Sequence, residues 1–271
     1  MFCSNCGTNL PNEAAFCPKC GNAITTTQTS AAAQAVADTP FGIHQDFTAE
    51  QLTFYKKTYL TAGFSFLAWM LIVLGLFDTG IAIDIVYGLG KISWLLVLGI
   101  FWGASYIGEK LTVSEEKEKQ YIGLGIYIAA YAVIFLPLIS IVVEYSYGSW
   151  RMAMDNVLIP AFISAFTVFA ALTATVFATK TDFSFMRTFV IFGSFFALGA
   201  IIIFSVAGMH VGSWFAIAMI ILMSVTILYQ TDQIKTKFDT TQHIGAGAMI
   251  FASFMVLLWY VIRLFVSRSD D

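Results

Sequence analysis

The sequence predicts an all-α polytopic membrane protein, with a bundle of seven transmembrane helices that follows a small cysteine-rich N-terminal domain. Three observations support this fold class. Of the 271 residues, 58% are hydrophobic and only 11% are charged, whereas soluble domains carry about 25% charged residues. Long apolar runs recur from residue 50 onward, and all four cysteines lie within the first 20 residues. A single soluble domain of this size cannot bury so much apolar surface, so that class is excluded.

Charge and composition exclude further classes. The 14 basic and 17 acidic side chains give a net charge of −3, which argues against nucleic-acid binding because such a protein presents a basic face. The low charge and the five prolines are not typical of a disordered chain. The sequence holds no metalloprotease, serine-hydrolase or nucleotide-binding motif, so we expect no enzymatic activity and no catalytic residues.

The four cysteines predict a metal site. Cys3, Cys6, Cys17 and Cys20 form two C-x-x-C pairs, each followed by glycine, with ten residues between the pairs. Four thiolates at this spacing are typical of a closed tetrahedral site in which zinc is structural. Two disulfides are the alternative, which is less favoured because no secretory signal precedes the cysteines. The segment resembles the short zinc ribbons at the N-termini of many bacterial membrane and regulatory proteins.

Composition also predicts the domain boundaries. We expect a zinc ribbon over residues 1–22, a flexible linker over residues 23–48 and a membrane domain over residues 49–271. The linker contains the run TTTQTSAAAQ, which has no large apolar side chain to bury. The ribbon is therefore expected to be tethered to the membrane domain.

Seven apolar runs of 19 to 23 residues predict the transmembrane helices. They are residues 59–77, 88–107, 121–143, 157–178, 188–207, 211–229 and 244–262. A helix needs about 20 residues to cross roughly 30 Å of hydrocarbon. Six runs hold no formal charge, and the second holds only Lys91 near one end. Polar alternation at period two is absent, which disfavours a transmembrane β-barrel.

The Lys and Arg residues predict the orientation of the bundle. Nine fall on the side of the N-terminus and four on the other side. The nine are Lys56, Lys57, Lys110, Lys117, Lys119, Lys180, Arg187, Lys235 and Lys237, and the four are Lys91, Arg151, Arg263 and Arg268. This asymmetry predicts a cytoplasmic N-terminus and an external C-terminus, in a bacterial cytoplasmic membrane. The cysteines then lie in a reducing compartment, where zinc is favoured over disulfides.

Three stretches carry a resemblance to a known family. They are IFLPLI at residues 134–139, FATKTDFSFMRTF at 177–189 and ILYQTDQIKTKFD at 227–239. With them, residues 50–271 resemble the transmembrane Bax inhibitor motif family. The resemblance implies a seven-helix bundle with a central, atypical last helix. Members are described as calcium-leak channels or as regulators of stress responses, and one bacterial branch is linked to a membrane-anchored ATP-dependent protease.

The resemblance also points to two positions in the last two helices. Calcium-leak members carry one acidic residue after the Tyr of the LY motif and another ten residues before an Arg in the last helix. In this sequence those positions are Gln230 and Ser253, the latter counted back from Arg263. Paired carboxylates share a proton and titrate, whereas a Gln–Ser pair can form a hydrogen bond but cannot titrate. This departure argues against a pH-gated mechanism and brings the sequence closer to the protease-linked branch.

Other ionisable groups near the predicted membrane are further candidates. Asp232 follows Gln230 by two residues, about 200° around a helix, so we expect it to face elsewhere, at the interface in a loose pair with Lys235. Glu144 ends the third span, where it faces an outer mouth or only the membrane interface. His210, in a short outer loop, is a candidate pH-sensitive group; a solvated surface histidine is the alternative.

Two functions follow as hypotheses. The first is a leak pathway for calcium or other cations between the helices of the bundle. Its candidate pathway or gate residues are Gln230, Asp232, Ser253 and Glu144. The second is a non-conducting regulator of a membrane-anchored ATP-dependent protease or of a stress response, whose ribbon docks a cytoplasmic protein partner. Both hypotheses place the protein in the lipid bilayer, and neither involves nucleic acid.

Overall fold

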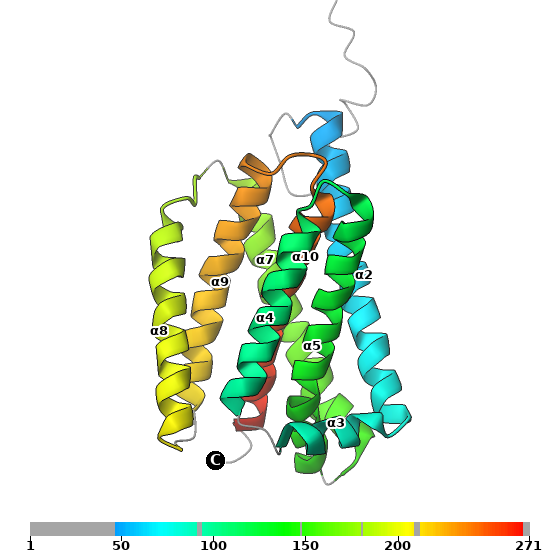
Figure 1. Ribbon diagram of the computed structural model, residues 1–271. Helices are drawn as coiled ribbons and strands as arrows, with labels where there is room; N and C mark the ends of the chain where they lie inside the picture. The colour runs from blue at the N-terminus through cyan, green and yellow to red at the C-terminus, as the bar shows by residue number, and fades with distance from the viewer. Residues whose placement is uncertain (1–46, 91–93, 147, 180, 209–211, 268–271) are drawn as a thin grey trace, which may run out of the picture. The chain divides into compact units, whose positions relative to one another are not determined.

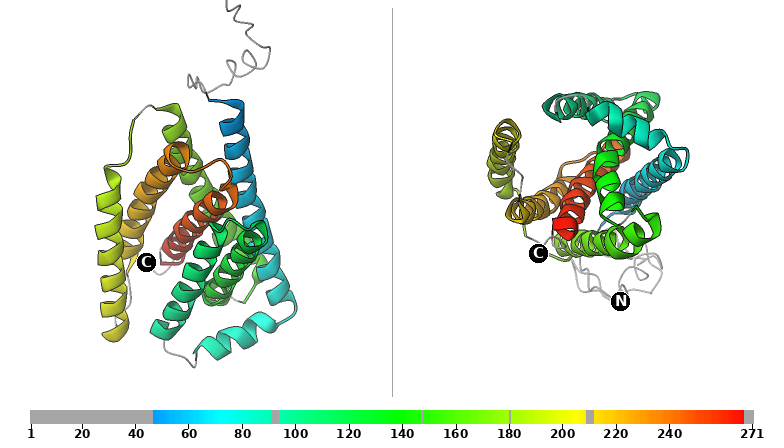
Figure 2. Two further views of the ribbon diagram at one scale, coloured as in Figure 1. Left: turned by 45° about the horizontal axis from the view of Figure 1, so that its top comes forward. Right: turned by 90° about the horizontal axis from the view of Figure 1, so that it is seen from below.

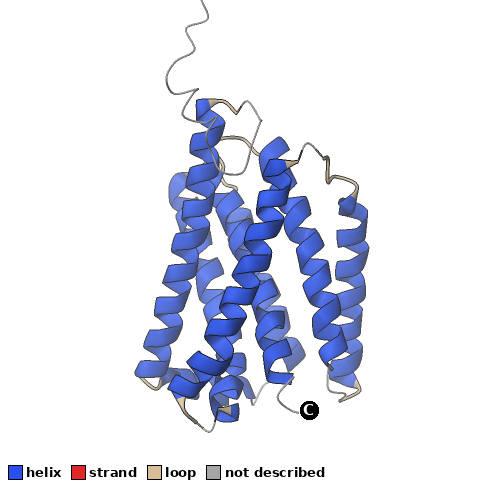
Figure 3. Ribbon diagram, turned by 180° about the vertical axis from the view of Figure 1, so that it is seen from behind, coloured by secondary structure: helices blue, strands red, loops and turns tan. Residues whose placement is uncertain are grey.

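Every regular element in the described part of the chain is a helix. The computed structural model describes residues 47–90, 94–146, 148–179, 181–208 and 212–267 (Figures 1 and 3). The helices are α2 (Ala49–Asp78), α3 (Ile81–Gly90), α4 (Trp94–Thr112), α5 (Lys117–Tyr145), α6 (Trp150–Ala153), the π-helical segment η1 (Met154–Leu158), α7 (Ile159–Ala178), α8 (Met186–Val206), α9 (Ser213–Thr236) and α10 (His243–Ser267). This content confirms the predicted all-α class.

Six helical stretches are long and apolar enough to cross a membrane. They correspond to six of the seven predicted spans. The six are α2, α5, the continuous stretch Trp150–Ala178 that joins α6, η1 and α7, then α8, α9 and the His243–Val266 part of α10. The protein is therefore a multi-pass membrane protein by length and composition of its helices.

The second predicted span, residues 88–107, is not confirmed. The short helix α3 ends at Gly90, and the separate helix α4 begins at Trp94. In α4 the uncharged stretch runs only from Trp94 to Gly108, because Glu109 and Lys110 follow. These 15 residues extend about 22 Å as a helix, which is shorter than the ~30 Å hydrocarbon layer. Even so, α4 lies lengthwise beside α5 in the bundle (Figure 1).

Helix α10 occupies the centre of the bundle. It packs against α2, α4, α5, α7 and α9 (Figures 1 and 2). In its apolar stretch 56% of the residues are buried, against 6% in the peripheral α8. Close approach to α2 depends on Gly247, where a Cβ atom would lie 2.7 Å from Thr61 Cβ and 2.9 Å from the Thr58 carbonyl oxygen. The central last helix that the resemblance implies is thus present.

The helix directions define two ends of the bundle. One end, termed the α9–α10 end, holds the start of α2 and the connections α4–α5, α7–α8 and α9–α10 (Figure 1). The opposite end, termed the α8–α9 end, holds the last residues of α2, α5, α8 and α10. Residues early in α2, α5 and α10, and late in α7 and α9, therefore belong to the α9–α10 half.

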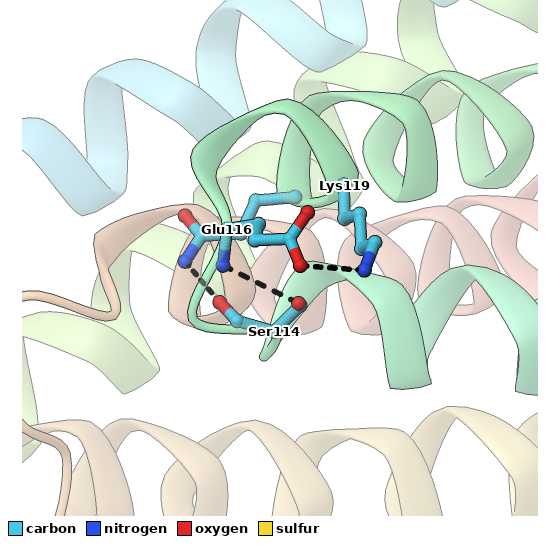
Figure 4. A network of polar contacts seen from close by, with 4 residues as sticks. Ser114, Glu116 and Lys119 are labelled. Carbon is cyan, nitrogen blue, oxygen red and sulfur yellow. Dashed lines mark hydrogen bonds and ion pairs between the residues drawn. The ribbon is translucent and has the colours of Figure 1, made fainter.

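Polar contacts fix the turn between α4 and α5 at the α9–α10 end. The Glu116 amide donates to Ser114 Oγ at 3.4 Å, and Lys119 Nζ lies 2.6 Å from Glu116 Oε1 (Figure 4). Gln120 Nε2 donates to the Ser114 carbonyl at 2.6 Å. Since Glu116 and Lys119 are largely solvent-exposed, these contacts order a surface turn and do not form an interior site.

Candidate functional site

The two positions singled out in the last two helices lie against each other. The Ser253 hydroxyl of α10 donates a hydrogen bond to the Gln230 side-chain carbonyl of α9. Ser253 is 3% exposed, so the contact lies inside the bundle. Gln230 reaches α10 because it shares a face with Ile227 and Ile234, which are fully or almost fully buried and follow the helical spacing. The pair joins α9 to the central helix without a formal charge.

Asp232 faces a different neighbour, as the 200° rotation predicts. The amide of Phe183 and the carboxylate of Asp182, both in the α7–α8 connection, lie close to its carboxylate. Its side chain is only 2% exposed, and its Oδ2 atom is buried without a hydrogen-bond partner. The α7–α8 connection therefore covers this carboxylate, which is not open to solvent.

The predicted pair of Asp232 and Lys235 is not a direct ion pair among the described residues. Lys235 Nζ instead donates to the carbonyls of Val176, at 3.1 Å, and Thr179, at 3.2 Å, where α7 ends. Terminal carbonyls of a helix lack partners and carry partial negative charge, so they attract an ammonium group. The two side chains still interact at longer range. Lys235 thus joins the ends of α9 and α7.

The α7–α8 connection that covers Asp232 is itself ordered by a local hydrogen bond. Asp182 Oδ1 accepts the backbone amide of Ser184 at 2.8 Å. This contact stabilises the ionised carboxylate and lowers the pKa of Asp182 below its usual value. Asp182 therefore stays ionised at neutral pH and adds a second negative charge near Asp232.

A layer of aromatic side chains lies on the other side of the Gln230–Ser253 pair, in the α8–α9 half. Phe66, Trp69, Phe135, Phe162 and Phe254 form this aromatic cluster, with ring centroids 5.0 Å apart for Phe66–Phe162 and Trp69–Phe135. Phe254 joins it through Phe66 at 5.5 Å and Phe162 at 5.9 Å. An apolar cavity of about 190 Å³ borders the cluster. These rings pack around α10 and leave this cavity beside them.

The remaining candidates are not brought to this site. Glu144 is exposed in the last turn of α5, at the end of the bundle opposite to Asp232. His210 and the four cysteines lie outside the described residues. Within the described ranges, no group of three or more His, Cys, Asp or Glu side chains is placed to hold a metal ion.

Sequence reasoning missed three hydroxyl residues of the interior. Tyr59, Thr173 and Thr231 belong to α2, α7 and α9, and their hydroxyl oxygens are buried without partners. Only the fold brings together residues that lie more than 50 positions apart in sequence. A threonine in an apolar run gives no sign by itself of the side to which its hydroxyl turns.

Comparison with known families assigns both parts of the chain. The model of the family described as inhibitor of apoptosis-promoting Bax1 matches residues 51–270. The chain belongs to the Bax inhibitor family. A zinc-ribbon domain matches residues 2–24, which include all four cysteines. A search of curated proteins finds no match to the chain.

The two matches bear on different chemistry. The Bax inhibitor match covers the whole helical bundle, including Gln230, Asp232 and Ser253. The zinc-ribbon match indicates structural zinc at the N-terminus. The donor set fits this metal, because four thiolates complete a tetrahedral zinc site and leave no open position for catalysis.

Proposed function

We propose that this Bax inhibitor family protein is a leak pathway for calcium and other cations across the membrane. The observation that carries the proposal is the part-buried hydrogen bond between the buried Ser253 and Gln230, which joins α9 to the central helix α10. Polar side chains inside a membrane bundle are costly and mark substrate or ion pathways. Asp232 supplies a carboxylate on the α9–α10 side of this pair, and Glu144 supplies one at the other end.

The conformation described here represents a closed state of that pathway. The aromatic cluster packs around α10 in the α8–α9 half, with ring centroids about 5 Å apart, and these apolar rings disfavour the passage of a hydrated cation. Conduction therefore requires α10 to move relative to α2 and α7. Because Gln230 and Ser253 do not ionise, this movement is not controlled by titration of the pair.

Calcium influx into liposomes that contain the purified full-length protein tests the proposal, with empty liposomes as the reference. We expect influx above the reference, and a decrease for Asp232→Asn and for Glu144→Gln because each removes a cation-attracting charge. Influx unchanged in both variants would remove these residues from the pathway. Influx equal to that of empty liposomes would contradict the leak itself.

The proposal also includes the orientation of the bundle in the membrane and a zinc site at the N-terminus. We place the ribbon and the α9–α10 end in the cytoplasm of a bacterial cell, because nine of the thirteen Lys and Arg residues in the membrane domain lie on that side. Cys3, Cys6, Cys17 and Cys20 would hold structural zinc there. Chelation is then expected to unfold residues 1–22 while the helices persist. A ribbon that stays folded without metal would contradict this.

A non-conducting regulator is the second candidate. It is favoured by the aromatic closure of the bundle and by the zinc-ribbon match, since such a small domain serves readily as a docking module. In this case the ribbon binds a cytoplasmic partner and the bundle contacts a membrane-anchored protease or acts in a stress response. Co-purification of a partner that is lost in Cys17→Ser would support it, and an unchanged set of partners would count against it.

A further inference from the structure

Three hydroxyl groups meet inside the α9–α10 half of the bundle without a well-aligned hydrogen bond. The Tyr59 hydroxyl of α2 faces the hydroxyls of Thr173, on α7, and Thr231, on α9. The Tyr59 hydroxyl lies within hydrogen-bonding reach of both threonine hydroxyls, but none of the three oxygens makes a well-aligned hydrogen bond, and all three are enclosed by surrounding atoms. We call these three residues the hydroxyl cluster.

The two threonines depart from the behaviour of most hydroxyl residues in this bundle, as do Thr58 and Ser105, whose buried hydroxyls also lack a partner. A Ser or Thr inside a helix commonly donates to the carbonyl four residues earlier, which satisfies its hydroxyl without a neighbour. Thr226 does so to Leu222 at 2.8 Å. Thr61, Ser65, Ser164, Thr167, Thr175, Ser224 and Thr236 form the same contact. Thr173 and Thr231 instead turn their hydroxyls toward Tyr59.

Two further buried polar atoms without partners lie on α9 nearer the α9–α10 end. Asp232 Oδ2 and Gln233 Nε2 are buried and have no hydrogen-bond partner, and these residues directly follow Thr231. Successive side chains point about 100° apart around a helix, so the three atoms surround the last turns of α9. Each such atom costs free energy unless a polar partner reaches it. Lipid offers none.

We propose that the hydroxyl cluster binds a water molecule that enters from the α9–α10 end along the last turns of α9. A buried water makes about three hydrogen bonds, and three neutral hydroxyls, each able to donate or accept, supply that number. Bound calcium requires about six to eight oxygen ligands with carboxylates among them, so the cluster does not suit a calcium ion. The water site lies within the proposed pathway but does not depend on conduction.

Hydroxyl-radical footprinting of the full-length wild-type protein in lipid nanodiscs tests this site. Radicals generated from bound water by X-ray irradiation oxidise neighbouring side chains, and mass spectrometry measures the rate at each residue. We expect Tyr59 to be oxidised at least about fivefold faster than Phe135, because water contacts only the former. Phe135 is 1% exposed and packs against Trp69 and Trp259. Equal rates at the two rings would overturn the proposal.

A matched pair of cysteine variants provides a second measurement. The native cysteines all lie in residues 1–20, so a label in the membrane domain reports only the introduced thiol. We expect a small water-soluble thiosulfonate to modify Thr231→Cys at least about tenfold faster than Thr226→Cys, because the reactive thiolate forms only next to water. Side-chain exposure alone predicts no such preference, since Thr231 is 0% and Thr226 is 8% exposed. Equally slow reaction of both would contradict the site.

Neither measurement depends on calcium flux. Water at Tyr59 in a protein that passes no calcium would leave the water site standing and reject the leak. Calcium flux in a protein whose Tyr59 is protected from oxidation would support the leak and reject the water site.

Discussion

The two halves of the helical bundle differ in the side chains that α2 and α7 place in them. In the α9–α10 half, α2 and α7 contribute the hydroxyls of Tyr59 and Thr173. In the α8–α9 half, the same helices contribute the rings of Phe66 and Phe162. The Gln230–Ser253 hydrogen bond separates these regions. The comparison shows that both halves pack aromatic rings, as Tyr55 and Phe177 do at 5.2 Å in the α9–α10 half, but that only this half holds the hydroxyl cluster.

The largest expected effect is on the stability of the aromatic half. Phe135→Ala should lower the free energy of unfolding by about 3 kcal/mol, because it leaves a cavity among closely packed rings. Phe192→Ala is the matched control, since this ring on α8 is 70% exposed toward lipid and should cost little. Unfolding by denaturing detergent in bicelles measures both variants. Equal losses would show that the aromatic cluster has no special role.

Restoring an acidic pair should give the polar half a pH response. In the double variant Gln230→Asp/Ser253→Asp, the two carboxylates share a proton at low pH and hold α9 against α10. At high pH both ionise and repel each other. We expect calcium influx about tenfold higher at pH 8 than at pH 6, which corresponds to a coupling of one pKa unit.

The neutral variant Ser253→Asn is the control for that experiment, and its influx should not change with pH. If the influx of the double variant is also independent of pH, the residues at positions 230 and 253 do not control the opening of the pathway.

Loss of the part-buried Gln230–Ser253 hydrogen bond should have a smaller effect. Ser253→Ala removes the donor and leaves the Gln230 carbonyl without it, at an expected cost of about 1 kcal/mol. Ser164→Ala is a suitable comparison, because the Ser164 hydroxyl bonds only within its own helix, to the Pro160 carbonyl. If the two alanine variants unfold at the same detergent concentration, the contact between α9 and α10 contributes nothing measurable.

The smallest effect is expected at the end of the polar half. Lys235→Met removes the ammonium group that caps α7 through Val176 and Thr179, and should cost about 0.5 kcal/mol. Lys237→Met, two residues further along, removes the same charge from an exposed position and serves as the control. Hydrogen exchange at the last turn of α7 should increase only for Lys235→Met. An increase in both variants would indicate a general charge effect.

The sequence alone predicts most of the fold, because hydropathy reports helix length directly. Six spans and the central place of α10 agree with expectation. The second span differs, since counting apolar residues from Gly88 does not reveal that the helix restarts at Trp94 and that Glu109 and Lys110 shorten its apolar part. Breaks inside an apolar run depend on packing, which hydropathy does not record.

The candidate site is less predictable from sequence. The proximity of Gln230 and Ser253 follows from the family resemblance, and the rotation of Asp232 away from them follows from helix geometry. The burial of Asp232 does not, because the α7–α8 connection that covers it lies about 50 residues earlier in the chain. The hydroxyl cluster likewise depends on three helices meeting, a tertiary fact with no local signal.

The central claim, that cations cross this bundle through a pathway without a titrating gate, is tested most directly by calcium influx at two pH values. Liposomes that contain the wild-type protein are compared with empty liposomes at pH 6 and at pH 8. We predict influx above the empty liposomes at both values, and of similar size, because the Gln230–Ser253 pair does not ionise. Absence of influx at both pH values would contradict the claim and favour the non-conducting regulator.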